Sequence, residues 1–174
     1  MAGQVGWRGP LRDRSLDRVL ERTDRDPRSG DGVARVSNAA KRGEVRMLGW
    51  VGDVERATLA NDTFRTVLYT GKHVQLTVMR LAPGEDIGRE AHPHLDQFLR
   101  IESGTGRVEF GRSEDEVGET HDVEGDWAII VPAGVWHNVV NTGDGDLKLY
   151  SLYAPPEHPD GAVHRTKADA AEPG

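Results

Sequence analysis

The feature that most constrains the fold is a series of short β-type segments, separated by turn residues, between residues 64 and 153. Residues 73–81 alternate between two sets of side chains, as expected of a strand. Residues 127–131 are almost continuously apolar, which predicts a strand buried on both faces. Further strands are expected at 64–70, 86–92, 97–102, 107–111, 136–140 and 147–153, with a hairpin loop at 112–119. About eight or nine short strands without a long helix predict an all-β fold, an antiparallel sandwich or barrel.

The composition of the 174-residue chain narrows the classes of function. The chain has no Cys, which excludes disulfides and thiolate metal sites. Its formal charge of −7 argues against nucleic acid as a partner, because phosphate binding needs a basic patch. No apolar run approaches the ~20 residues that a membrane span needs, and the N-terminus lacks the apolar core of a secretory signal. We therefore expect a cytoplasmic protein that binds a small molecule.

The first 46 residues differ in charge from the rest of the chain. They hold 11 Lys and Arg against 7 Asp and Glu, whereas residues 47–174 hold 11 against 22. The first segment has few large apolar side chains, so it buries too little surface to offset the entropy of ordering. We predict a disordered extension at 1–46, a β-barrel at 47–153 and an extended tail at 154–174. A further hypothesis is that Met47 is the natural start and that the initiation site is mis-called. The alternative is a basic arm that contacts an acidic partner.

Metal-capable side chains gather in one short segment and at one later position. Glu90, His92 and Gln97 lie close together, and His137 follows 40 positions after Gln97 on another expected strand. Because strand side chains alternate between faces, Glu90 and His92 point the same way. Imidazoles with oxygen ligands suit a divalent transition metal, namely Fe, Mn, Zn, Ni or Co, and disfavour Ca. If these faces line one cavity, the four side chains form a metal site.

The spacing of these residues resembles the two motifs of the cupin superfamily. The first motif, G-x5-H-x-H-x(3,4)-E-x6-G, is matched by Gly84, Glu90, His92, Gln97 and Gly104. The second motif, G-x5-P-x-G-x2-H-x3-N, is matched by Asp126, Pro132, Gly134, His137 and Asn141. The likeness covers residues 64–153 and is strongest to small single-domain bacterial cupins of the cupin-2 type, some labelled mannose-6-phosphate-isomerase-like. It implies an antiparallel jelly-roll β-barrel with metal ligands at Glu90, His92, Gln97 and His137.

Three positions depart from the family pattern. Glu90 stands for the first His, Gln97 stands for the Glu, and Asp126 stands for the Gly that opens the second motif. The set still has one carboxylate and two imidazoles, so its formal charge is unchanged. Gln97 either binds the metal more weakly than Glu or donates a hydrogen bond to a ligand of the metal. The alternative for the whole set is a barrel that has lost its metal and whose polar groups pair with one another.

Other polar and aromatic residues receive simpler assignments. His94 is expected at the rim of the cavity, with a role as substitute ligand as the alternative. His158 and His164 are expected to be exposed in the tail, with a lid as the alternative. Trp127 and Tyr153 are expected to pack in the core.

The resemblance implies a metal-dependent enzyme that acts on a small polar molecule, such as a sugar or a hydroxy or keto acid. The reaction would be isomerase-like or, with iron, oxygenase-like. No catalytic residue is assigned, because Glu90 as a ligand is less available as a general base. The alternatives are a non-catalytic module that senses a small ligand, and a structural role. Exposed edge strands and an apolar last strand predict a homodimer.

Overall fold

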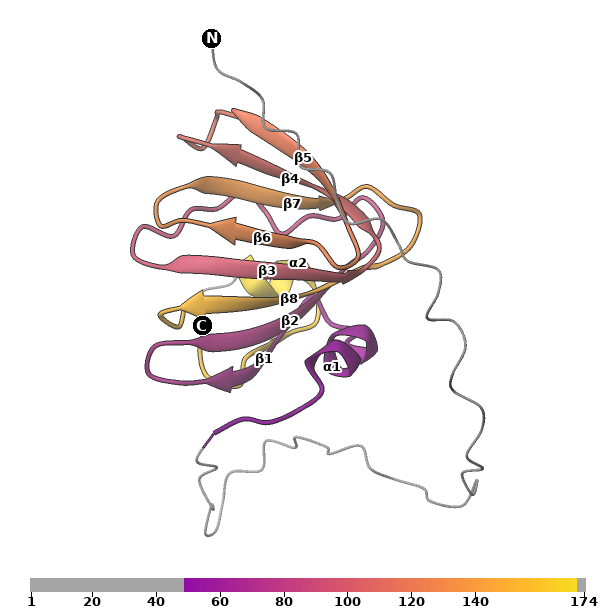
Figure 1. Cartoon of the computed structure of the whole chain (residues 1–174), viewed down its shortest axis with the longest axis vertical. Coiled ribbons are helices and arrows are strands. Elements are labelled where there is room, and N and C mark those ends of the chain that lie inside the picture. The colour runs from indigo at the N-terminus through magenta and orange to yellow at the C-terminus, as the bar shows by residue number, and fades with distance from the viewer. Residues whose placement is uncertain (1–48, 172–174) are drawn as a thin grey trace, which may run out of the picture. The chain divides into compact units, whose positions relative to one another are not determined.

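The computed structural model describes residues 49–171 (Figure 1). The predicted extension at 1–46 and the proposed start at Met47 lie outside the described residues. No helix in the described part of the chain is long and apolar enough to cross a membrane.

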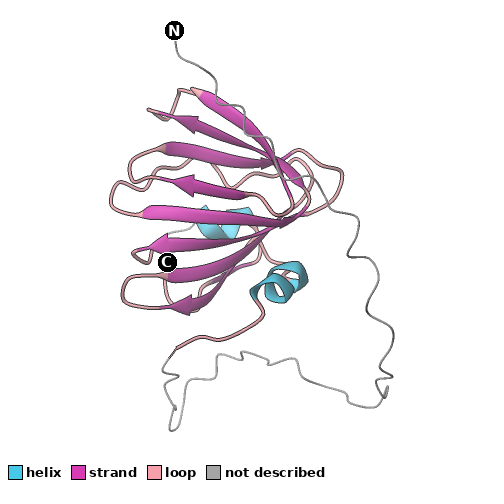
Figure 2. Ribbon diagram, viewed as in Figure 1, coloured by secondary structure: helices cyan, strands magenta, loops and turns pink. Residues whose placement is uncertain are grey.

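Short strands make up most of the described chain, and two short helices flank them (Figure 2). The strands are β1 (Arg65–Thr70), β2 (Gln75–Leu81), β3 (Asp96–Ser103), β4 (Thr105–Gly111), β5 (Glu119–Glu124), β6 (Ala128–Val131), β7 (Trp136–Asn141), β8 (Leu147–Ala154) and β9 (Val163–His164). The helices are α1 (Val54–Ala60) and α2 (Lys167–Ala171).

Two antiparallel sheets share one core. The larger has six strands in the order β6-β3-β8-β2-β1-β9, and the smaller has three in the order β5-β4-β7. Apolar side chains from both sheets form a single buried cluster, which includes Leu99 and Leu149 from the larger sheet and Val108 and Val139 from the smaller. The predicted all-β antiparallel fold is confirmed.

The interior face of the larger sheet changes character along its strands. At one end, Met79 pairs in register with Leu149, which also pairs with Ile101. At the other end the rows are polar, with Thr77 beside Ser151 and with Tyr153 between Gln75 and Gln97. We call Met79, Leu81, Ile101, Leu147 and Leu149 the apolar end, and Gln75, Thr77, Gln97, Ser151 and Tyr153 the polar end. Every one of these side chains is buried.

Two residues of the family motifs have structural roles in backbone contacts. Gly104 has a φ of 95°, and a Cβ there would lie 2.7 Å from the carbonyl oxygen of Asp146. A side chain is therefore excluded both by conformation and by space. The amide of Asn141 donates to the carbonyl oxygens of Leu81 at 2.9 Å and Gly145 at 2.8 Å, and its oxygen accepts from the backbone of Gly143. These contacts join the β7–β8 turn to β2.

The prediction of a continuous strand at 86–92 is wrong. The segment touches β7 through two isolated bridges, from Asp86 to Val140 and from Glu90 to His137. Five residues, 86–90, lie opposite four, 137–140, so the pairing contains a bulge. Gly88 lies within it, with a φ of 93° that few other residues adopt.

The prediction that residues 127–131 are buried on both faces is also wrong. Ile129 and Val131 are buried, but Ile130 is 68% exposed and Trp127 is 48% exposed. The reason is the position of β6 at the edge of the larger sheet, where only its inner face meets the core. A run of apolar letters does not distinguish such an edge strand from a central one.

Four elements were not expected from the sequence. β5 carries charged side chains and buries only Val123, so it lacks the apolar pattern of a strand. α1 is seven residues long, with Asp53 capping its N-terminus by accepting from the backbone of Arg56 at 3.0 Å. After β8, the chain returns along the barrel as β9, paired with β1, and ends in α2. Lys167 of α2 forms an ion pair with Asp86.

Candidate metal centre

Backbone contacts bring the two motifs together. Glu90 and His137 exchange two hydrogen bonds, with N–O distances of 3.0 and 2.9 Å. The backbone of Gly134, in the turn before β7, donates to the carbonyl oxygen of His92 at 2.9 Å. The bulge at Gly88 immediately precedes this contact, as bulges often do where a strand must redirect a side chain. The strand β7 thus fixes His137, and through it the segment that carries Glu90 and His92.

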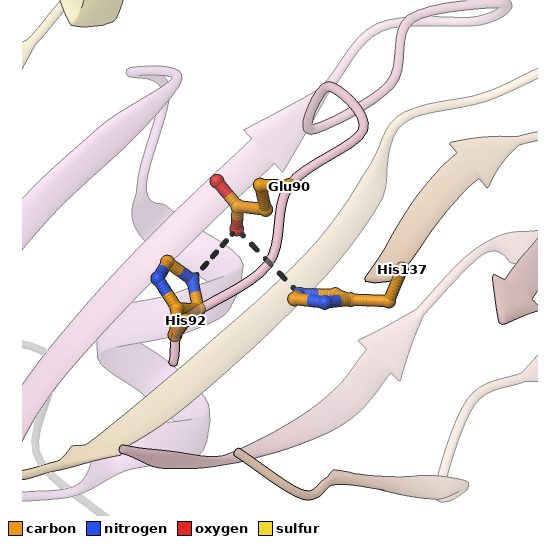
Figure 3. A group of neighbouring side chains, drawn as sticks. All are labelled: Glu90, His92 and His137. Atoms are coloured by element: carbon orange, nitrogen blue, oxygen red, sulfur yellow. Dashed lines mark hydrogen bonds and ion pairs between the residues drawn. The ribbon is translucent and has the colours of Figure 1, made fainter. Parts of the chain in front are cut away.

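Three of the four predicted ligands form one compact group (Figure 3). Their ligand atoms all lie within 4.8 Å of one another. One carboxylate oxygen, Glu90 Oε1, is 3.3 Å from His92 Nε2 and 3.6 Å from His137 Nε2. His137 is fully buried, whereas 27% of the Glu90 side chain is exposed. The group is therefore reached from solvent on the side of Glu90.

A second contact on each imidazole fixes which nitrogen faces the carboxylate. His137 Nδ1 lies 3.2 Å from the carbonyl oxygen of Val135, which can only accept, so Nδ1 carries the proton. In the neutral ring His137 Nε2 then presents a lone pair to Glu90 Oε1. The buried Nε2 atom has no hydrogen-bond partner within residues 49–171. His92 Nδ1 lies 3.3 Å from Glu157 Oε1. Two electron-pair donors that face each other call for a cation, either a proton or a metal ion.

The electrostatics of the group favour a negative carboxylate between the imidazoles. Burial alone would raise the pKa of Glu90, but its contacts with His137 and His92 outweigh that effect and lower the pKa to about 2. Burial opposes the positive charge on His92, but Glu90 and Glu157 more than compensate and raise its pKa. Glu90 is therefore ionised throughout the physiological range, as a metal ligand must be.

Gln97, the fourth predicted ligand, lies in the polar end of the larger sheet. Its amide nitrogen donates to Ser151 Oγ at 3.1 Å, while its Oε1 is buried without a hydrogen-bond partner in the described residues. The neighbour of Gln97 in the register, Tyr153, has its ring 5.8 Å from that of His92. The amide oxygen is thus free to accept, and the assignment of Gln97 as a ligand stays a prediction.

The remaining histidines divide into two sets. His94 is exposed, consistent with a place at the rim, and His73 and His121 are exposed as well. The prediction that His158 and His164 are exposed is wrong. Both are partly buried, and the His158 ring stands 4.9 Å from the ring of Tyr153 in an edge-to-face arrangement. Tyr153 is fully buried as predicted, but its hydroxyl lacks a hydrogen-bond partner in the described part of the chain.

Sequence reasoning missed Glu157, the residue that positions His92. It lies 65 positions further along the chain, in a Pro-containing segment after the last long strand, and no spacing rule links the two. Two hydrogen bonds hold that segment in place, because Gln75 Oε1 accepts from the backbone of Glu157 at 3.2 Å and of His158 at 2.9 Å. A buried glutamine at the end of β2 thus anchors the segment that supports the metal site.

Comparison with known proteins agrees with this architecture. A Cupin domain model matches residues 77–153. A crystal structure of the BH2720 protein from Bacillus halodurans is 52% identical, with a TM-score of 0.70, and the match covers 73% of this chain and 96% of that one. The chain belongs to the cupin family. The predicted cupin jelly roll is confirmed.

Two cupin relatives extend the comparison. The uncharacterized protein YrkC of Bacillus subtilis is 60% identical over 121 residues, which cover 70% of this chain and 65% of YrkC. The chain thus spans less than two thirds of that protein. The uncharacterized protein L612 of Acanthamoeba polyphaga mimivirus is 41% identical over 115 residues, which cover 66% of this chain and 70% of L612.

Proposed function

We propose that this cupin binds one divalent transition metal through Glu90, His92 and His137, with the amide oxygen of Gln97 as a fourth donor. The observation that carries the proposal is a facing pair of acceptors 3.6 Å apart, Oε1 of the partly exposed Glu90 and Nε2 of the buried His137. A metal bound there would act as a Lewis acid that polarises an oxygen atom of a substrate. Two imidazoles and one carboxylate leave coordination positions for such a molecule.

The residues of the chain have separable tasks in this proposal. Glu157 and the carbonyl group of Val135 orient the two imidazoles, so that each presents Nε2. The buried side chain of His137 keeps water from the inner side of the site. Burial raises the pKa of the Tyr153 hydroxyl to about 12, so at neutral pH this group keeps its proton for donation to a ligand and does not act as a base.

Metal content tests the proposal. Elemental mass spectrometry on the full chain, purified without a His-tag, is expected to find close to one metal per protein. The variant His92→Ala/His137→Ala should lose the metal. The matched control is His73→Ala/His121→Ala, which removes two exposed imidazoles and should retain it. A wild-type protein that stays metal-free after reconstitution with Fe, Mn, Zn, Ni and Co would overturn the proposal.

The proposed activity is a reaction of a small polar molecule, a sugar or a hydroxy or keto acid, by isomerase-like or oxygenase-like chemistry. Bound iron would favour the oxygenase-like reaction, and bound zinc, manganese or nickel the isomerase-like one. Turnover in a substrate panel is expected to disappear with a chelator and in His137→Ala, and to return to the wild type when metal is restored. Activity that survives both treatments would refute a metal-dependent enzyme.

A non-catalytic ligand-binding module is the second candidate. The side chains that would transfer protons in catalysis favour this candidate, because they are engaged in other contacts or have a shifted pKa. Glu90 lies between two imidazoles, Glu157 contacts His92, and the pKa of Tyr153 is raised to about 12 by burial. Tight binding of a small molecule to the metal-loaded protein, without turnover in any panel, would decide for this candidate.

We also propose a homodimer in which edge strand β6 contributes to the contact. The supporting observation is the exposure of Ile130 on the outer face of β6 and of Trp127 directly before this strand. Light scattering should give twice the mass of the chain for the wild type and a smaller mass for Ile130→Glu. A monomer at all working concentrations would refute the dimer.

A further inference from the structure

One cation in the interior of the barrel, Arg65, has no negative partner among residues 49–171. Arg65 lies on β1, where it pairs in register with Met79 of the apolar end, and it is only 5% exposed. None of the carboxylates in residues 49–171 lies within ion-pair distance of its guanidinium. Its Nε is buried without a hydrogen-bond partner, and the Phe64 ring, 5.4 Å away, is a weak substitute for an anion. A guanidinium stays charged in a protein, so such burial is costly unless an anion arrives.

Three more polar groups near Arg65 have no hydrogen-bond partner in the part of the chain that the structure describes. The hydroxyl of Tyr153, Nε2 of His158 and Nδ1 of His164 are all buried without a hydrogen bond among the described residues. The rings of Tyr153 and His158 are 4.9 Å apart, those of His158 and His164 are 6.5 Å apart, and His164 pairs in register with Arg65. These four side chains, which we call the Arg65 cluster, come from β1, β8 and the segment that follows β8.

The charge of Arg65 acts on all three neighbours. Burial and, after it, the positive charge of Arg65 lower the pKa of His158 to about 3. Burial and Arg65 likewise lower the pKa of His164. At neutral pH both imidazoles are therefore neutral, each with one N–H to donate. The cluster offers one fixed positive charge and several hydrogen-bond donors.

The cluster adjoins the candidate metal site. The ring of Tyr153 is 4.9 Å from that of His158 and 5.8 Å from that of His92, so one side chain borders both groups. The Glu90 and Glu157 side chains are 27% and 39% exposed, so solvent reaches the metal site beside these two carboxylates.

We propose that Arg65, with Tyr153, His158 and His164, binds the carboxylate group of a small hydroxy or keto acid whose other oxygen faces the metal site. This inference rests on the proposed function and selects an acid over a neutral sugar as the substrate class. The planar fork of a guanidinium matches a carboxylate in two parallel hydrogen bonds. A single carboxylate charge balances the single guanidinium, whereas a phosphate carries about −1.5 to −2 at pH 7 and would be left uncompensated.

Calorimetric titration of the metal-loaded full chain tests the site, with L-lactate and pyruvate as acid probes, lactamide as the uncharged analogue and inorganic phosphate as the competing anion. We expect both acids to bind more tightly than lactamide and phosphate. Arg65→Met should weaken the binding of the acids by roughly 30-fold or more, since it removes one partner of a buried charge pair. Arg65→Lys keeps the charge but loses the fork, and should lie between the wild type and Arg65→Met.

Controls separate this inference from the proposed function. Arg107→Met removes an arginine that pairs with Glu109 elsewhere on the barrel, and should bind the acids like the wild type. Arg65→Met should keep its metal and should not melt earlier than the wild type, because it replaces an unpaired buried charge. Metal-loaded wild type that binds lactate and lactamide equally, or prefers phosphate, overturns the carboxylate site alone. Absence of metal from the wild type overturns the proposed function itself. The comparison of the acids with lactamide and phosphate uses the wild-type protein alone, so it does not depend on the folding of a variant.

Discussion

The apolar end and the polar end of the larger sheet's interior are built on the same strands, β2, β3 and β8, and are equally buried. In the apolar end, every side chain is a hydrocarbon or a thioether that packs into the core shared by both sheets. In the polar end, Thr77 Oγ1, Gln97 Oε1 and the Tyr153 hydroxyl are buried without a hydrogen-bond partner in the described residues.

The difference between the ends separates stability from function. A buried polar group without a partner costs about 1–3 kcal/mol, so the polar end lowers the stability of the fold. Natural proteins depart from consistent packing mainly at functional sites. The polar end also lies beside the candidate metal site, because Tyr153 borders His92. We infer that packing in the apolar end offsets the stability lost in the polar end, where the unpaired polar groups remain available to bind a ligand.

The largest expected effect is at the apolar end. Leu149→Ala should lower the free energy of unfolding by about 2–5 kcal/mol, because it removes a fully buried side chain and leaves a cavity. Urea unfolding measures the loss, and metal per folded protein should stay unchanged. Leu152→Ala, the same change on the opposite face of β8 at a partly exposed position, is the control and should cost less. Equal losses at the two positions would contradict the distinction between core and surface on this strand.

The next effect is at the support of the metal site. Glu157→Gln should weaken metal binding by roughly 10- to 100-fold, as is typical when the residue that orients a ligating imidazole is changed. The free energy of unfolding of the metal-free protein should change little, because Glu157 is partly exposed. Competition with a metal-binding dye gives the affinity. Glu109→Gln, on the smaller sheet and paired with Arg107, is the matched control, and an equal change in both variants would argue against a role for Glu157.

The sequence predicted the strands and the motif residues better than it predicted the contacts between distant segments. Alternation and turn residues placed β2, β3, β7 and β8, because a strand with one buried face has a period of two in its letters. The spacing of the family motifs predicted that Glu90, His92 and His137 lie together, because this spacing reflects the bulge at Gly88 and the turn before β7. Such rules describe one segment at a time. The contact of Glu157 with His92 and the return of the chain over the barrel depend on packing between distant segments.

The pH dependence of stability should reveal the burial of His158. Burial lowers its pKa from 6.5 to about 3 in the folded protein, so the unfolded chain binds one more proton between these values. The free energy of unfolding from this residue is therefore complete above pH 6.5 and falls as the pH decreases, by at most about 1.4 kcal/mol per pH unit. His164, whose pKa burial also lowers, contributes with the same sign.

Urea unfolding between pH 6.5 and 5 measures this slope, above the range in which Glu90 titrates. His158→Gln should flatten it, and His73→Gln, at an exposed position, should leave it as in the wild type. A slope that is the same in all three proteins would mean that His158 is accessible to protons in the folded state. A His158 that takes up a proton would add a second positive charge to the Arg65 cluster, which would no longer carry the single charge of Arg65.

The smallest expected effect is an increase in the stability of the fold. Thr77→Val replaces a buried hydroxyl that has no partner among residues 49–171 with a methyl group of the same shape, so the protein should become more stable by about 1 kcal/mol and melt a few degrees later. Val78→Thr, the reverse change at the next position and on the opposite face of β2, should be destabilising by a similar amount. If Thr77→Val instead lowers the melting temperature, the hydroxyl has a partner in the folded protein, and the polar end does not reduce stability at this position. If it raises the melting temperature and also weakens acid binding, the same hydroxyl opposes folding and serves the site, which is the relation that the two ends of the interior lead us to expect.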